Sequence, residues 1–109
     1  MCIRDSSNVA VGDGALRVNT TGGSGVAVGF YALYSNTTGS NNTAVGKNAL
    51  TAVTTGERNS ALGMNALGGS GTGVTNNTAL GVNALYNTTG SSNTACGDAA
   101  LYTLSLIHI

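Results

Sequence analysis

The sequence is short of the residues that most catalytic sites and charged binding surfaces use. It has no proline or tryptophan, one histidine, two cysteines and one phenylalanine, and only 7% of its 109 residues are charged. Lysine and arginine balance aspartate and glutamate, so the net charge is zero. Such a chain lacks the charge that nucleic acids and anionic membrane surfaces attract. No apolar run approaches the ~18 residues of a spanning helix, so we expect no nucleic acid partner and no membrane contact.

The two ends of the chain read as sequencing adaptor. Residues 1–6, MCIRDS, and residues 104–109, LSLIHI, match the translations of the two strands of one transposase-based library adaptor. We therefore predict that both hexapeptides are artefacts and that residues 7–103 are a fragment of a longer protein. His108 and Cys2 fall in the adaptor, which leaves the repeat region with no histidine and with Cys96 as its one cysteine.

What the chain has in abundance is glycine, alanine, asparagine, threonine and serine, a composition that superficially suggests a disordered linker. Disorder normally accompanies low hydropathy and high net charge. Here the mean hydropathy is +0.14 and the net charge is zero. The composition therefore predicts an ordered chain.

An Ala-x-Gly triplet recurs along the whole chain. Its alanines are separated by 17, 17, 17, 18 and 16 residues, and they are Ala10, Ala27, Ala44, Ala61, Ala79 and Ala95. The insertion and the deletion cancel, because the turn glycines stay 17 apart, at Gly22, Gly39, Gly56, Gly73 and Gly90. Such compensation is expected when each unit stacks on its neighbour, and a flexible linker has no reason to show it.

Each repeat unit reads as one coil made of short extended pieces. The glycine-free runs are shorter than the ~12–15 residues that a marginal helix requires. Alternation in Asn-Thr-Ala-Val-Gly indicates a short strand that the glycine ends, with alanine on one face and its neighbours on the other. An Ala-Leu pair begins a second extended piece, and Asn-Thr-Thr-Gly supplies the turn. The sequence therefore predicts an all-β parallel β-solenoid, or β-roll, of about six coils of 17 residues.

Stacking the coils at ~4.8 Å turns each repeated position into a column along the axis. We predict a thin core from two columns, the leucines that follow alanine and the column of Val11, Val28, Val45, Leu62, Leu80 and Cys96. The alanine column is expected to leave room for another sheet or another chain. Because so thin a core buries little apolar area at ~25 cal/mol per Å², we expect partner chains to cover more of it in a homo-oligomer.

The pattern Asn-Thr-Ala-Val-Gly-x-x-Ala-Leu-Tyr-x-Asn-Thr-Thr-Gly resembles the head repeats of trimeric autotransporter adhesins and related bacteriophage tail fibres, over residues 8–102. The resemblance implies a left-handed parallel β-roll in which three chains share one axis. It also implies a fibre that mediates attachment or display, on the bacterial outer surface or in a phage virion tail. A host surface, extracellular matrix or glycan receptor would be its partner. The repeat is longer here than in the commonest version of the family.

The residues predict no enzyme, no catalytic or cofactor-binding residue, no cofactor and no metal site. Without His108, the fragment has three carboxylates, three basic groups and one thiol spread over different coils, and no nucleophile stands beside a base. Asn48 follows Gly46-Lys47, which rules out a phosphate loop. Asp13 and Asp98 are too few for a calcium ladder. Cys96 is expected to be a small buried hydrophobic residue.

Two further columns carry polar or aromatic groups. We interpret the asparagines as a structural amide ladder, with a ligand-facing row as the alternative, at Asn8, Asn42, Asn59, Asn77 and Asn93. Tyr34, Tyr86 and Tyr102 follow the leucine column in three units, where other units have Arg17, Thr51 and Gly68. A column so variable is expected to be exposed. The three tyrosines are therefore the candidate recognition surface, for sugars or receptor side chains, against the alternative of ordinary scattered surface residues.

Two other functions remain open. An ice-binding β-solenoid would use a regular array of threonines, but Thr37-Thr38 and Thr54-Thr55 are adjacent residues in the turn and cannot share one strand face. A functional amyloid-type repeat would stack short, weakly charged β-prone units between chains, although frequent glycines disfavour it.

Overall fold

The computed structural model describes residues 2–4 and 7–104. These residues form a parallel β-solenoid of about five turns of roughly 17 residues, with no helix in the described part of the chain. The predicted fold class is confirmed, with about one turn fewer than the six that the repeats predict. The predicted adaptor residues 1, 5–6 and 105–109, which include His108, lie outside the described residues.

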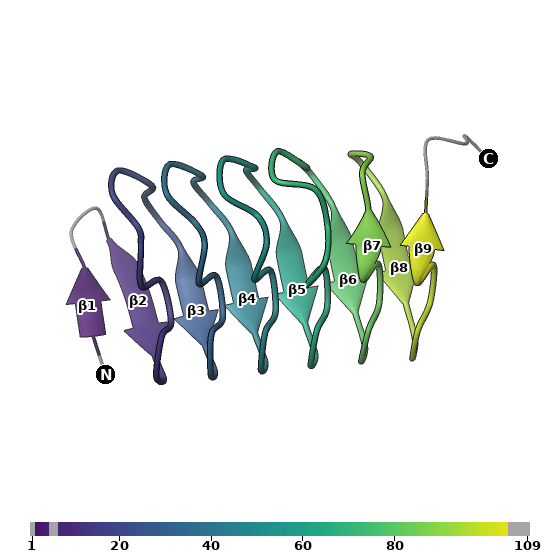
Figure 1. The fold of residues 1–109 in the computed structure, drawn as a ribbon, viewed down its shortest axis with the longest axis horizontal. Helices are drawn as coiled ribbons and strands as arrows, with labels where there is room; N and C mark the ends of the chain where they lie inside the picture. Colours follow the sequence, from purple (N-terminus) through teal and green to yellow (C-terminus); the bar gives the residue numbers. More distant parts are fainter. Residues whose placement is uncertain (1, 5–6, 105–109) are drawn as a thin grey trace.

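The strands stack one per coil along a long axis, and the two ends of the stack are the two ends of the chain (Figure 1). The stack measures 38 × 21 × 15 Å. Its strands are β1 (Cys2–Arg4), β2 (Asn8–Val11), β3 (Val26–Val28), β4 (Thr43–Val45), β5 (Ser60–Leu62), β6 (Thr78–Leu80), β7 (Asn87–Thr88), β8 (Thr94–Cys96) and β9 (Thr103–Leu104).

One sheet runs the length of the stack in the order β1-β2-β3-β4-β5-β6-β8, and β7 pairs with β9 in a second, two-stranded sheet. From β2 to β8 the strands are parallel, and each alanine of the triplet pairs with the alanine of the next coil, as Ala44 does with Ala61. Residues 2–4 of the predicted adaptor pair antiparallel with β2. The register survives the unit of 18 residues and the unit of 16, as the spacing predicts.

Left-handed backbone turns close each coil. Gly29 has a φ of 130°, and a β-carbon there would lie 2.8 Å from the backbone of Gly46, so only glycine fits. The leucine of each Ala-Leu pair is also left-handed, as Leu33 is with a φ of 51°. That conformation costs roughly 1–2 kcal/mol for a residue with a side chain. Full burial of Leu33 contributes about 1.5–3 kcal/mol, which offsets the cost.

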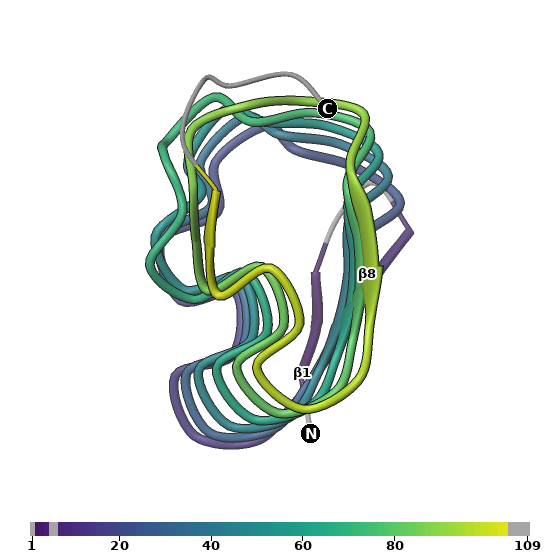
Figure 2. The same ribbon diagram turned by 90° about the vertical axis from the view of Figure 1, so that its right-hand side faces the viewer.

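The core lies between the sheet and the opposite wall of each coil, which dips towards the sheet (Figure 2). Both the alanine column and the leucine column point inward, and Leu33, Leu50 and Ala44 are fully buried. The column of Val11, Val28, Val45, Leu62, Leu80 and Cys96 points outward, so its predicted place in the core is wrong. Alternation places the alanine and its two neighbours on opposite faces of the strand. The interior of the coil is narrow, so it holds the small alanine side chain opposite the leucine. The alanine column therefore offers no room to another chain.

A ladder of buried asparagines holds consecutive coils together. Asn42 Nδ2 donates to the Gly56 carbonyl of its own coil at 2.8 Å, and Asn42 Oδ1 accepts from the backbone N–H of Asn59 in the next coil at 2.9 Å. Asn59 repeats both contacts: its Nδ2 donates to the Val74 carbonyl, and its Oδ1 accepts from the backbone N–H of Asn77. The structural interpretation of the asparagine column is confirmed, because these side chains face the coil interior and bind backbone groups.

Candidate functional site

The outer face of the seven-stranded sheet is the candidate site. Because side chains alternate across a strand, the residues on either side of each buried alanine point out of the coil. They form two straight rows, one of Val9, Val26, Thr43, Ser60, Thr78 and Thr94 and the other of Val11, Val28, Val45, Leu62, Leu80 and Cys96. Neither row contains a charged residue. This surface is defined here as the outer face.

The outer face exposes large apolar side chains. Leu62 is 49% exposed, Leu80 43% and Val9 40%. Between β4 and β6 the surface is hollowed into a shallow groove of about 290 Å³, lined by Thr43, Val45, Ser60, Ala61, Leu62, Thr78, Ala79 and Leu80. Soluble monomers rarely expose large contiguous apolar patches, and such patches mark interaction surfaces. The outer face can therefore seat another apolar surface.

One rim of the outer face is the corner row that follows the glycine at the end of each strand. Its members are Asp13, Phe30, Lys47, Met64, Val82 and Asp98. Three of the six are charged, and all six are exposed. The other three, Phe30, Met64 and Val82, are apolar, so this edge of the face mixes charged and apolar side chains.

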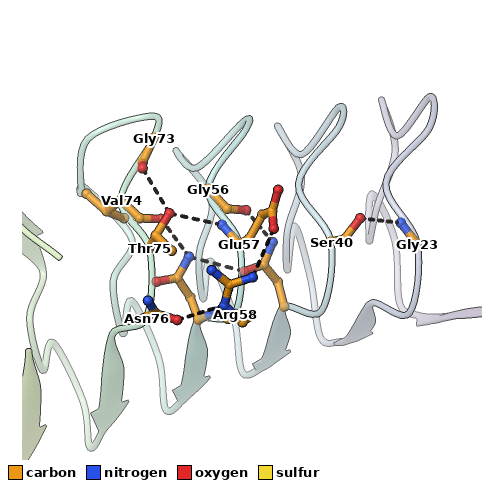
Figure 3. Close-up of polar contacts among 11 residues, drawn as sticks. Gly23, Ser40, Gly56, Glu57, Arg58, Gly73, Val74, Thr75 and Asn76 are labelled. Atoms are coloured by element: carbon orange, nitrogen blue, oxygen red, sulfur yellow. Dashed lines mark hydrogen bonds and ion pairs between the residues drawn. The ribbon is translucent and has the colours of Figure 1, made fainter. Parts of the chain in front are cut away.

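The other rim lies at the amino-terminal ends of the strands and is polar (Figure 3). Arg58 Nε donates to Asn76 Oδ1 at 2.9 Å, and Arg58 pairs with Glu57 at 3.2 Å, the one ion pair among the residues that the structure describes. Hydroxyl groups link adjacent coils here, since the Glu57 N–H donates to Thr75 Oγ1 and the Gly23 N–H to Ser40 Oγ. A mixed rim and a polar rim thus border an uncharged face.

The structure brings two of the three predicted recognition tyrosines together. Tyr86 and Tyr102 stack with ring centroids 5.1 Å apart, whereas Tyr34 lies three repeats earlier in the sequence. Tyr102 is 45% exposed, whereas Tyr34 and Tyr86 are less exposed and are partly buried. A β-carbon at Gly69 would lie 2.7 Å from the Tyr86 ring, so this tyrosine covers a bare stretch of backbone. Whether the tyrosines bind a receptor stays a prediction.

Cys96 stands exposed on the outer face as a free cysteine, so its expected burial is wrong. The column that it shares with valine and leucine was correctly identified, but that column faces outward. Period-2 alternation specifies which residues share a face and does not specify which face is inside.

The described residues hold no group of three or more histidine, cysteine, aspartate or glutamate side chains that could hold a metal ion. No helix long and apolar enough to cross a membrane occurs in the part of the chain that the structure describes. Comparison with protein-family models, with curated proteins and with solved structures finds no match to this chain. The functional assignment therefore starts from the outer face and the repeat.

Proposed function

We propose that residues 7–103 are a structural repeat segment of a surface-exposed fibrous adhesin or phage tail fibre, and that three copies associate through the outer face. The observation that supports this proposal is the outer face itself, which carries no charge over six consecutive strands of the sheet. On it, Leu62 and Leu80 are each more than two fifths exposed. The resemblance of the repeat to trimeric autotransporter heads and tail fibres supports the number three and the role in attachment or display.

Association through this face is energetically reasonable. Covering a leucine or valine that is about 40% exposed contributes about 1 kcal/mol per side chain. Association itself costs an estimated 4–15 kcal/mol in lost translational and rotational freedom. The face carries seven valine or leucine side chains over its six strands. Together they contribute at most about 7 kcal/mol per chain, which is of that size. Longer arrays of the same repeat would associate more strongly.

The solenoid suits a fibre because its length is set by the number of coils alone. Each added coil lengthens the stack by ~4.8 Å and leaves its cross-section unchanged. The same repeat can therefore project a terminal domain or display a receptor-binding surface at a chosen distance. The proposed location is the bacterial outer surface or a phage virion tail, with a host surface as partner.

Ice binding is a second candidate because of one observation. Thr43, Thr78 and Thr94 line up on the flat outer face beside a row of aliphatic side chains. These threonines are not the adjacent pairs in the turn, Thr37-Thr38 and Thr54-Thr55, on which the ice-binding alternative was first weighed. Val9 and Val26 interrupt the hydroxyl row in the first coils, which favours association between chains. A thermal-hysteresis assay decides, since an ice-binding face would produce measurable hysteresis and a fibre would not.

The amyloid-type alternative has less support. Strands β3 to β6 are already paired on both edges within one chain, so they offer no free edge for stacking between chains. Fibrils that bind dye and grow from dilute chain would favour this alternative.

Charge placed on the outer face tests the proposal. Leu62→Glu and Leu80→Glu leave the core intact, because both side chains point out of the coil, and they bury a charge in the proposed interface. We expect the unmodified chain to sediment as a trimer and both variants as monomers with an unchanged circular dichroism spectrum. Thr38→Glu is the matched control, since Thr38 is exposed in a turn away from the sheet. If the unmodified chain is a stable, soluble monomer, the result counts against the proposal.

A further inference from the structure

One coil carries an aromatic cluster that the repeat does not require. Phe30 and Tyr31 stack with ring centroids 4.1 Å apart, and Tyr31 and Tyr34 lie 4.6 Å apart at an angle of 48°. All three rings come from the unit that contains β3. The equivalent positions of the next coil are Lys47, Asn48 and Thr51, so the coil closes equally well without aromatic residues.

Tyr31 occupies a backbone conformation that disfavours it. Its φ is 60°, in the left-handed region, where the equivalent residues are Gly14, Asn48, Asn65, Asn83 and Ala99. Glycine and asparagine are the residues that adopt this conformation most readily. A tyrosine at this position is therefore not selected by the fold, and strained positions of this kind gather at functional sites.

Neighbouring coils leave room for the cluster and flank it with opposite charges. A β-carbon at Gly14 would lie 2.3 Å from the Tyr31 ring, so the ring fits only over glycine. Lys47 Nζ stands 5.9 Å from the centre of the Phe30 ring, one coil further along. Asp13 lies one coil before Phe30, is exposed, and accepts the Tyr31 N–H on its backbone carbonyl at 2.9 Å. Phe30 itself is 43% exposed, with Asp13 and Lys47 at the equivalent position of the coils on either side.

We propose that Phe30, Tyr31 and Tyr34, with Asp13 and Lys47, form a binding subsite for a sugar ring of a surface glycan. The apolar C–H face of a pyranose packs on aromatic rings, while its hydroxyl groups donate to a carboxylate and accept from an ammonium group. The mutual packing of the rings holds them in place before binding, which reduces the entropy lost on association. The inference rests on the proposed role in attachment, because it names the class of receptor.

The size of the cluster favours a sugar over a protein partner. Asp13 and Lys47 are two coils apart, about 10 Å at the strand spacing. That span fits one or two sugar rings, whereas a specific protein interface covers about 800 Å² on each partner. Phe30 also lies in the corner row at the edge of the outer face and in neither of its two rows, so association of three chains through those rows leaves the cluster accessible.

Phe30 is the only phenylalanine in the sequence, so labelling phenylalanine alone gives one ring signal that reports on the cluster. The full chain is titrated with a panel of hexose, N-acetylhexosamine and sialylated oligosaccharides and followed by NMR. We expect saturable shifts of the Phe30 signal with at least one of these sugars. No shift with any of them in a folded chain overturns the proposal. An aromatic peptide is titrated in parallel, and a shift with the peptide alone overturns the proposal in favour of a peptide site.

Residues taken from other coils provide the matched variants. Tyr31→Asn with Tyr34→Thr reproduces the next coil, keeps the Phe30 probe and removes the strained tyrosine, so we expect a folded chain with at least tenfold weaker sugar binding. Val82→Lys changes the exposed residue at the position equivalent to Phe30 three coils away and should leave binding unchanged. Equal binding by the double variant overturns the subsite, and so does loss of binding in Val82→Lys. If the double variant does not fold, Asp13→Asn replaces it, and we expect the same weakening of sugar binding.

Sedimentation of the same samples separates this inference from the proposed function. Sugar binding by a monomeric chain would contradict association through the outer face and leave the subsite standing. A trimer that binds no sugar would contradict the subsite alone.

Discussion

Asn42 and Asn59 lie one above the other in consecutive coils, and the Asn42 side-chain oxygen accepts both the backbone N–H of Asn59, at 2.9 Å, and its side-chain Nδ2, at 3.1 Å. Both residues are 1% exposed or less. One buried amide therefore satisfies groups of its own coil and of the next. Removing one leaves several buried backbone groups without partners, each at a cost of about 1–3 kcal/mol.

Asn59→Ala should accordingly destabilise the chain by about 2–4 kcal/mol, because the Val74 carbonyl and the Asn77 N–H both lose their partner. Urea unfolding followed by circular dichroism measures the change. Ser60→Ala, at the adjacent exposed position, is the control and should stay within ~0.5 kcal/mol. Equal stability of Asn59→Ala and the control would show that the ladder does not hold the coils together.

Gly25 is the gap in the asparagine ladder, and filling it should stabilise the chain. Gly25→Asn restores the residue of the other coils and removes the flexibility of glycine from the unfolded state, for a gain of about 0.5–1 kcal/mol. The added β-carbon would lie 3.1 Å from Asn8 Oδ1, so the Asn8 amide must shift by a few tenths of an ångström. Asn42 and Asn59 show that asparagines can occupy this position in two consecutive coils. A lower urea midpoint for Gly25→Asn than for the unmodified chain would refute this expectation.

The alanine column should reject larger residues. Ala44 is fully buried against the leucines, so Ala44→Leu overfills the interior and should cost about 1–3 kcal/mol or more. Val45→Leu, on the outward neighbour, adds one methylene to the surface and should change monomer stability little. The two variants are compared by thermal unfolding at low chain concentration. Tolerance of leucine at Ala44 together with intolerance at Val45 would mean that the faces are reversed.

Cys96 offers a chemical probe of the outer face. Its thiol is exposed on a single chain, so association through that face should slow its alkylation by several-fold. Leu80→Glu, which we expect to keep the chain monomeric, should restore the fast rate. The rate is followed by mass spectrometry after timed treatment with iodoacetamide. Identical rates in both chains, at concentrations where the unmodified chain is associated, would place the interface elsewhere.

The repeat predicted much of the fold, because one period of 17 fixes the register, the strand and the turn in every coil at once. The parallel pairing of Ala44 with Ala61 and the structural role of Asn42 follow from that period. What the pattern could not decide is which strand face is inside. Val45 is larger and more apolar than Ala44, so composition alone favours Val45 for the core. The narrow cross-section, which needs the three-dimensional path of the coil, selects the alanine instead.

The candidate site was predictable only in part for the same reason. The expectation of a homo-oligomer rests on the thinness of the core and stays a prediction, but the alanine column is buried within the chain and was the wrong surface for it. The aromatic cluster at Phe30 and Tyr31 left a signal in the sequence, since these residues depart from the repeat at two consecutive positions. The predicted recognition surface follows the regular tyrosine column instead, and that column does not include Phe30 or Tyr31. The strain at Tyr31 becomes visible only with the backbone angle.

Association of the chain through its outer face is the central claim, and sedimentation equilibrium measures it. The single chain has a mass of 10.7 kDa. We expect the unmodified chain to approach three times that mass as its concentration rises, and Leu62→Glu to stay at the mass of one chain over the same range. A folded, unmodified chain that remains at 10.7 kDa at the highest concentration reached would contradict the proposed trimeric fibre.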